Sequence, residues 1–208
     1  MKSILIRFGI MIIVCFLFFG VLPLFNKETQ ETKEDHKLYP LYKIEEPNQI
    51  EDFNHIHLLG ITMEFPFSMA DLPEVFHIKD MYYDDMVDGI EAGDYFHCEL
   101  LNEDNEAVAY LRVSNLKKNI AKSPDGMTVT YMEVSTFEVD GETYGVPFSI
   151  YKGVGIGSKG EEAKAVFPEI TVSKKGYSIA TTTMGIHSIT MEFFDNELYK
   201  MSIKSYDN

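Results

Sequence analysis

The chain has 208 residues, of which 33 are acidic and 18 are basic, giving a formal net charge of −15 at pH 7. Its hydrophobic fraction of 45% is too high for a disordered chain, and its negative charge argues against a nucleic-acid binder, because polyanions repel such a surface. With only two cysteines, Cys15 and Cys98, the chain builds neither a disulfide framework nor a four-thiolate zinc site.

An apolar run opens the chain. Residues 8–25 contain no charged side chain, and extending the run back to Ile4 includes Arg7. At ~1.5 Å per residue, a helix over residues 4–25 spans the ~30 Å hydrocarbon core of a bilayer. Residues 1–25 are therefore predicted to be a transmembrane anchor that contacts lipid through residues 4–25. A cleaved signal peptide is the alternative, but small residues at cleavage-site spacing are missing, and Cys15 lacks the small preceding residue that lipidation requires.

The residues flanking this run predict its orientation. Lys2 and Arg7 lie in a very short N-terminal tail, which favours a cytoplasmic N-terminus and an extracellular C-terminal domain at the cell membrane. Residues 26–49 are rich in Glu, Lys, Thr and Asp, as is typical of a polar linker. We therefore expect a single-pass membrane protein that exposes an acidic domain outside the cytosol.

The rest of the chain shows an internal self-match. Residues 60–68, GITMEFPFS, recur as GETYGVPFS at residues 141–149, with five identities at a constant offset of 81. Residues 96–113 and 189–203 also resemble each other, because both read as strand–turn–strand with period-2 alternation. The matches keep the same order, so the sequence predicts a duplication with one repeat over residues 50–126 and another over 127–208.

Each repeat is expected to form antiparallel sheet with one short helix. In the first repeat the helix is predicted to begin near Ser68, with Met69, Leu72, Val75 and Phe76 at helical spacing. In the second, Ser158 and Glu161 form a capping-box pattern that predicts a helix over residues 159–167. The predicted fold class is α+β, consisting of an N-terminal transmembrane helix and two tandem sheet repeats.

These motifs carry a resemblance. With its Pro-Phe-Ser elements, the GIGSKGE segment from Gly155 to Glu161, the strand containing Tyr177 and the hairpin at residues 189–197, the chain resembles a family of uncharacterised, membrane- or lipid-anchored extracytoplasmic proteins of Gram-positive bacteria. The layout of the second repeat is also similar to helix-then-sheet modules of the beta-lactamase inhibitor protein. The resemblance covers residues 50–205 and implies a fold and a compartment. The family implies no activity, and inhibition of beta-lactamases is not carried over because the disulfides of the inhibitor proteins are missing.

Three patterns suggest chemistry, and each has a simpler structural interpretation. The acidic stretch from Asp80 to Asp94 suggests weak calcium binding. When the stretch is aligned with the EF-hand template from Asp84, however, it does not match the template, and a solvated loop explains the acidic residues. His55 and His57 alternate on a presumed strand and could hold zinc, but no third ligand is positioned by the sequence. Cys98 fits a buried apolar position better than a catalytic thiol.

Two further motifs are discounted. Ser114 and Lys117 match the Ser-x-x-Lys motif of penicillin-binding enzymes. That motif requires its serine at the start of a helix, whereas Ser114 is expected to end a strand. The glycines at 153, 155 and 157 are not followed by the Gly-Lys-Ser/Thr of a P-loop. No catalytic, metal or cofactor residue is therefore assigned.

Tyrosines alternate with polar residues along the predicted strands at positions 110, 131, 144, 151, 177 and 199. Most strand aromatics pack in the core, but several on one exposed face would suit recognition of a protein or glycan. The sequence thus predicts a non-enzymatic extracytoplasmic binding or interaction module, whose partner is an envelope protein or a glycan. The alternatives are a cell-envelope enzyme that uses His55 and His57, and a weak divalent-cation-binding surface protein that uses Asp84–Asp94.

Overall fold

The computed structural model describes residues 52–79 and 89–206, all of which belong to one compact unit. The predicted anchor (residues 1–25), the linker (residues 26–49) and Asp80–Asp88 of the acidic stretch lie outside the described residues. Within the described ranges, none of the helices combines the length and the apolar character needed to cross a bilayer.

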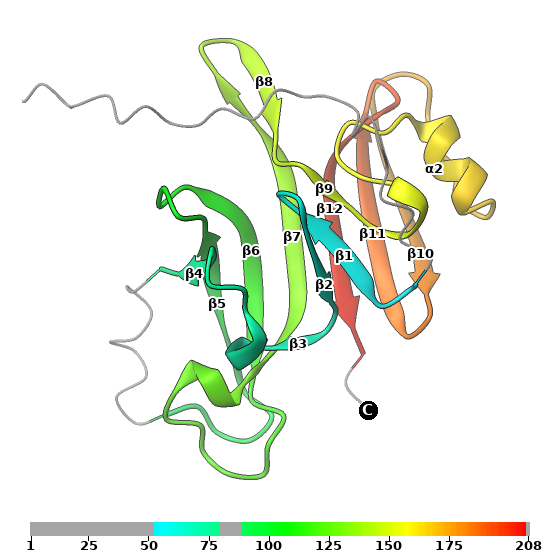
Figure 1. The fold of residues 1–208 in the computed structure, drawn as a ribbon. Helices are drawn as coiled ribbons and strands as arrows, with labels where there is room; N and C mark the ends of the chain where they lie inside the picture. The colour runs from blue at the N-terminus through cyan, green and yellow to red at the C-terminus, as the bar shows by residue number, and fades with distance from the viewer. Residues whose placement is uncertain (1–51, 80–88, 207–208) are drawn as a thin grey trace, which may run out of the picture. The chain divides into compact units, whose positions relative to one another are not determined.

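A large antiparallel sheet organises the described chain (Figure 1). Two short strands, β3 (Phe67–Ser68) and β8 (Glu142–Gly145), also pair with its central strand β7. The main path of the sheet, in spatial order, is β10 (Tyr177–Met184), β11 (His187–Phe194), β12 (Glu197–Ser205), β7 (Thr128–Val139), β6 (Ala107–Ser114), β5 (Tyr95–Leu101) and β4 (His77–Ile78).

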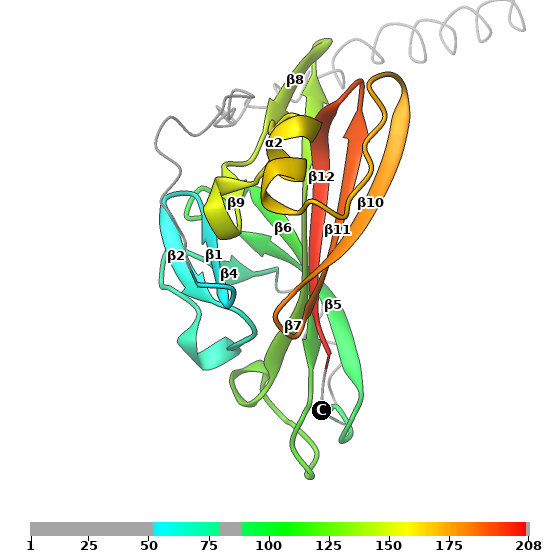
Figure 2. The same cartoon turned by 90° about the vertical axis from the view of Figure 1, so that its right-hand side faces the viewer.

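A second layer covers one face of this sheet. It contains a small sheet in the order β2 (Ile61–Glu64), β1 (His55–Leu58) and β9 (Phe148–Ser149), together with helix α2 (Gly160–Val166). Figure 2 shows α2, β9 and the β1–β2 hairpin on the same side of β7, β11 and β12. The core lies between the layers and contains fully buried side chains from both, including Ile56, Leu58, Phe148, Leu111, Met132, Met191, Phe193 and Met201. The architecture is mostly antiparallel sheet with one α-helix among the described residues.

The strands follow from period-2 patterning. Along β11, His187, Ile189, Met191 and Phe193 are buried and alternate with more exposed residues. Such alternation buries one face of a strand and leaves the other toward solvent. The strand–turn–strand predictions at residues 96–113 and 189–203 are confirmed by the β5–β6 and β11–β12 hairpins.

Both Pro-Phe-Ser elements have the same local structure. Each follows a hairpin whose turn contains two residues with positive φ, Leu59 and Gly60 in the first case and Asp140 and Gly141 in the second. This conformation is favoured in tight hairpins because its twist matches that of the strands, and it explains a glycine at each turn. Each proline then leads into a two-residue strand and a 3₁₀ turn, η1 (Met69–Asp71) or η5 (Tyr151–Gly153).

The two short strands cross between the predicted repeats. β3, from the first, pairs with β7, where Phe67 lies opposite Val129. β9, from the second, pairs with β1, where Leu58 lies opposite Phe148. Each predicted repeat therefore adds a short strand to a sheet of the other, and the two share one core. The duplication itself stays a prediction.

The helix predicted in the first repeat is wrong beyond one turn. Ser68 does begin a helical turn, since its hydroxyl accepts a hydrogen bond from the Ala70 N–H, but that turn ends at Asp71. Leu72 is extended, with φ −61° and ψ 126°. It precedes Pro73, and the proline ring disfavours a helical conformation in the residue before it.

The second helix is confirmed at Gly160–Val166, with its cap shifted by one residue. Lys159 rather than Ser158 is the N-cap, and its backbone N–H donates to the Glu162 carboxylate at 3.0 Å. The Ser158 hydroxyl instead accepts from the Gly155 N–H, and Glu161 accepts from the Asn196 side chain. The capping pattern thus located the helix correctly but not the residues that cap it.

Candidate functional site

The face of the large sheet opposite the core is the candidate site, and we call it the open face. Residues paired across an antiparallel sheet share a face. The strand registers therefore place on the open face a row that crosses six strands, made of Glu99, Tyr110, Glu133, Ser202, Thr190 and Thr181. Large side chains on the open face are exposed to solvent, with an exposed fraction of 39% for Tyr110 and 54% for both Ile179 and Tyr177.

A hydrogen-bonded network occupies one half of this face. The Glu192 carboxylate accepts from the hydroxyls of Tyr177 at 2.8 Å and Tyr199 at 2.9 Å. The Lys200 ammonium lies 3.6 Å from Glu192 and 3.1 Å from Glu133. Because its members come from β7, β10, β11 and β12, this network, which we call the tyrosine–glutamate network, ties four strands together. It also includes Tyr131, whose hydroxyl donates to Glu133 at 2.6 Å.

Electrostatics hold this network in one protonation state at neutral pH. Burial and the hydrogen bond to Glu133 raise the pKa of Tyr131 to about 12, and burial and Glu192 raise the pKa of Tyr199. For Glu192, burial alone would raise the pKa, but the hydrogen bonds from the two tyrosines and the charge of Lys200 outweigh it and lower the pKa. Neutral tyrosines, an anionic Glu192 and a cationic Lys200 therefore present a pre-oriented surface.

The lowered pKa of Glu192 gives a pH-dependent contribution to stability. A carboxylate whose pKa is lower in the folded state stabilises the fold above its ordinary pKa, and that contribution is lost as the pH falls through the folded-state pKa. We expect Glu192→Gln to lose less stability than wild type between neutral and acid pH, measured by urea denaturation across that range. Glu138→Gln, which removes an exposed carboxylate of β7 outside the network, should follow wild type. Identical profiles for all three proteins would contradict the role of Glu192.

The other half of the face carries the Tyr95 stack, formed by Tyr95, His97, Tyr110 and Arg112. The His97 ring lies 5.2 Å from the Tyr95 ring and 5.3 Å from the Tyr110 ring. The Arg112 guanidinium lies 5.1 Å from the centre of the Tyr95 ring and donates to the Thr130 hydroxyl at 3.1 Å. Stacked aromatics with a cation over one ring offer flat apolar area and hydrogen-bonding groups together.

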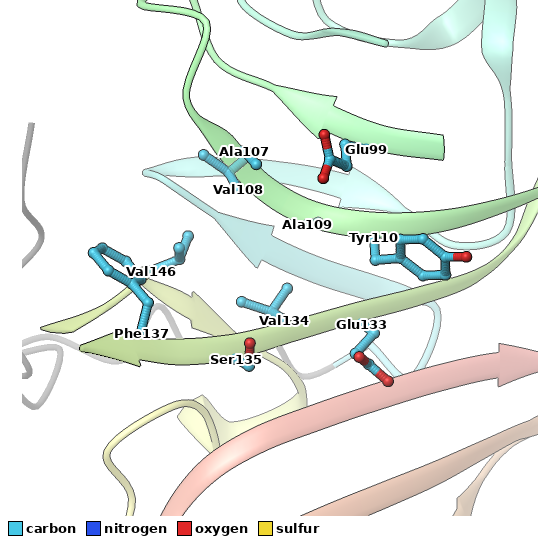
Figure 3. Close-up of a pocket in the computed structure, with 10 residues that line it drawn as sticks. All are labelled: Glu99, Ala107, Val108, Ala109, Tyr110, Glu133, Val134, Ser135, Phe137 and Val146. Carbon is cyan, nitrogen blue, oxygen red and sulfur yellow. The ribbon is translucent and has the colours of Figure 1, made fainter. Parts of the chain in front are cut away.

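A pocket of about 240 Å³ lies beside Tyr110. It forms because β6 and β7 pair only as far as Tyr110 and Glu133, after which β7 pairs with β8 from Thr136 onward. Figure 3 shows Glu133 and Tyr110 toward one end and apolar side chains toward the other. Glu99, also in the lining, forms an ion pair with Lys79 at 2.7 Å. The remaining lining residues are Ala107, Val108, Ala109, Val134, Ser135, Phe137 and Val146.

Four of the six tyrosines singled out in the sequence, at positions 110, 131, 177 and 199, lie on the open face within the tyrosine–glutamate network or the Tyr95 stack. Tyr144 lies on β8, where it is paired with Phe137 and donates to Glu142, while Tyr151 lies in η5 with its ring 4.4 Å from that of Phe53. The residues that bind or stack against the tyrosines were not predicted from the sequence. Their alternation with buried neighbours was the available signal, as in His97–Cys98–Glu99 and Met191–Glu192–Phe193.

The histidines considered as metal ligands have other neighbours. His55 and His57 lie on β1 as expected, where His55 is 3.4 Å from Asp52 and His57 shares a 3.1 Å hydrogen bond with Thr62. His187, which is buried, shares one with Asn54 at 3.2 Å. Among the described residues, His, Cys, Asp and Glu side chains do not gather in a group of three or more that could hold a metal ion.

Cys98 and Ser114 occupy structural positions. Cys98 is fully buried, and burial, with a smaller effect of Glu99, raises the pKa of its thiol to about 12, which disfavours the reactive thiolate. Ser114 ends β6 and shares a 2.7 Å hydrogen bond with the Thr130 hydroxyl. The Ser-x-x-Lys motif at Ser114 therefore lacks the helix that its chemistry requires.

Comparison with known proteins produced no match to a family model, to a curated protein or to a solved structure.

Proposed function

We propose that the protein is a non-catalytic binding module, anchored by residues 4–25 as a single-pass membrane protein, which recognises an envelope protein or glycan outside the cell. The open face is the proposed binding surface. The observation that carries this proposal is the gathering of four tyrosines on one sheet face, where carboxylates and a lysine hold several of them in place.

The chemistry of this face suits recognition. Tyrosines supply large contact area at a low cost in side-chain entropy, and they are enriched among residues that dominate binding energies. The pocket beside Tyr110 has an apolar end and a polar end, so it suits one side chain or sugar of a partner. The hydrogen bonds of the network reduce the ordering cost on binding, because the side chains are already oriented.

Binding can be tested with the full chain in membrane vesicles, incubated with cell-wall glycan strands in one experiment and with solubilised envelope proteins in another. We expect Tyr110→Ala and Tyr177→Ala each to weaken retention by about tenfold or more, in line with the loss of a central aromatic contact. Tyr151→Ala, which removes a tyrosine in η5 next to β9 of the second layer, is the control and should bind like wild type. If the open-face variants retain partners as well as the control does, the open face is not the binding surface.

A further inference from the structure

Strand β10 differs from every other edge strand described in this protein. At the opposite end of the large sheet, β4 has only two residues. Of the two strands off the main path of this sheet, β3 has two residues and β8 has four, beginning with the charged Glu142. In the small sheet, β9 has two residues, and β2 ends at the charged Glu64 just before Pro66. Short length, charge and proline are the means by which proteins keep sheet edges from pairing with other chains.

By contrast, β10 has eight residues, YSIATTTM, with no charge, proline or glycine. Within the described residues, β11 is its only strand partner, so its outer edge carries unpaired backbone groups. Four of its eight residues are β-branched, and such residues favour extended pairing. In a chain with 25% charged residues, β10 is the one long edge strand, among the described strands, that has no charged residue of its own.

Exposed apolar side chains gather around this strand. Of the ten large hydrophobic residues that are exposed in the described chain, five lie on β10 or on neighbouring segments. Tyr177 is paired across the strands with Phe194, and Phe53 lies beside the β10–β11 turn, 3.7 Å from where a Cβ on Gly185 would be. The other two are Ile179 and Ile186.

We propose that β10 pairs antiparallel with β10 of a second copy of this chain, which continues the large sheet across a twofold axis. A twofold axis perpendicular to the sheet keeps the open faces of both copies on the same side. Residues 177, 179, 181 and 183, which share the open face, then lie opposite the same set in the partner copy. On the open face, β-branched side chains of the two strands meet one another, and none of the paired β10 residues is charged.

Charge at the two ends of β10 favours this antiparallel arrangement over a parallel one. Lys174 and Lys175 are exposed just before the strand begins. Asp52 lies near the other end, because its carboxylate accepts from the Asn54 N–H, and Asn54 contacts His187 beside the turn. An antiparallel pair brings the lysines of each copy toward Asp52 of the other, twice by symmetry.

Cross-linking of the full chain in membranes tests the geometry. Thr181→Cys, in a Cys15→Ser background that keeps the buried Cys98, should form a dimer with a short bismaleimide, because the axis passes near the strand centre. We expect at least about ten times more cross-linked dimer than for Ser135→Cys, an exposed open-face position on β7. Thr181→Cys joined to a different protein, or no more dimer than the control, would overturn the proposal.

A second variant tests the energetics. Ile179→Lys places lysines from both copies near the axis, and we expect it to raise the dimer dissociation constant at least about tenfold in sedimentation of the detergent-solubilised full chain. Ser135→Lys should leave that constant unchanged, and circular dichroism should show that both variants are folded. A wild-type chain that stays monomeric at high concentration, or a dimer that Ile179→Lys leaves intact, would overturn the proposal. Loss of dimer with unchanged envelope binding, or the reverse, separates this inference from the proposed function.

Discussion

Phe193→Ala is expected to lower the free energy of unfolding by about 3–5 kcal/mol, whereas Phe194→Ala should lower it by less than about 1 kcal/mol. The two phenylalanines are adjacent on β11, but Phe193 is 0% exposed and Phe194 is 58% exposed. Truncating Phe193 removes buried apolar area and leaves a cavity between the layers. Phe194 lies on the other face, opposite Tyr177, where water already reaches it.

Urea denaturation followed by far-UV circular dichroism measures this difference. The midpoint should fall strongly for Phe193→Ala, with an unchanged slope, and shift little for Phe194→Ala. Because the variants remove the same atoms from neighbouring positions, they differ in burial and not in chemistry. Equal losses would mean that the core does not lie on the face of the sheet that carries Phe193.

Gly155→Ala is expected to destabilise the protein by about 3 kcal/mol or more through a backbone collision. A Cβ at this position would lie 2.0 Å from the Phe148 carbonyl oxygen and 2.9 Å from the Ser149 Cα. That carbonyl also accepts a hydrogen bond from the Ile156 N–H at 3.1 Å. Relieving the collision would displace β9, which pairs with β1 in the small sheet.

Gly141→Ala provides the matched control, because it tests a different cost of replacing glycine. Gly141 has a φ of +81°, and a Cβ added there would have nothing within 4 Å, so only backbone strain of about 1–2 kcal/mol opposes alanine at this position. Thermal and urea denaturation should show a much lower stability for Gly155→Ala than for Gly141→Ala. The reverse order would show that the approach of residue 155 to β9 is not tight.

Local patterns predicted the elements that depend on nearby residues. The β5–β6 and β11–β12 hairpins were predicted because strict alternation and a polar turn lie within about twenty residues of sequence. The helix at Gly160–Val166 was predicted for the same reason. The predicted first-repeat helix was wrong because apolar spacing alone does not account for Pro73, which keeps Leu72 extended and so ends the helical turn.

The candidate site was predicted only in part. Alternation indicated that several strand tyrosines could share an exposed face, and four of them do. Nothing local distinguishes His97, Arg112 or Glu192 from ordinary solvent-facing polar residues. Their grouping depends on strand order and register, which place β5 beside β6 and β11 beside β12.

Composition and periodicity were sufficient to predict an acidic, sheet-rich chain, because composition is read directly and strand alternation rests on residues close together in sequence. The internal self-match adds the prediction of two similar halves. Only the tertiary structure decided that β3 and β9 cross between those halves, that β6 and β7 separate beside a pocket, and that β10 forms an uncharged edge. These features depend on which distant strands pair, and burial of apolar surface over the whole core selects that pairing.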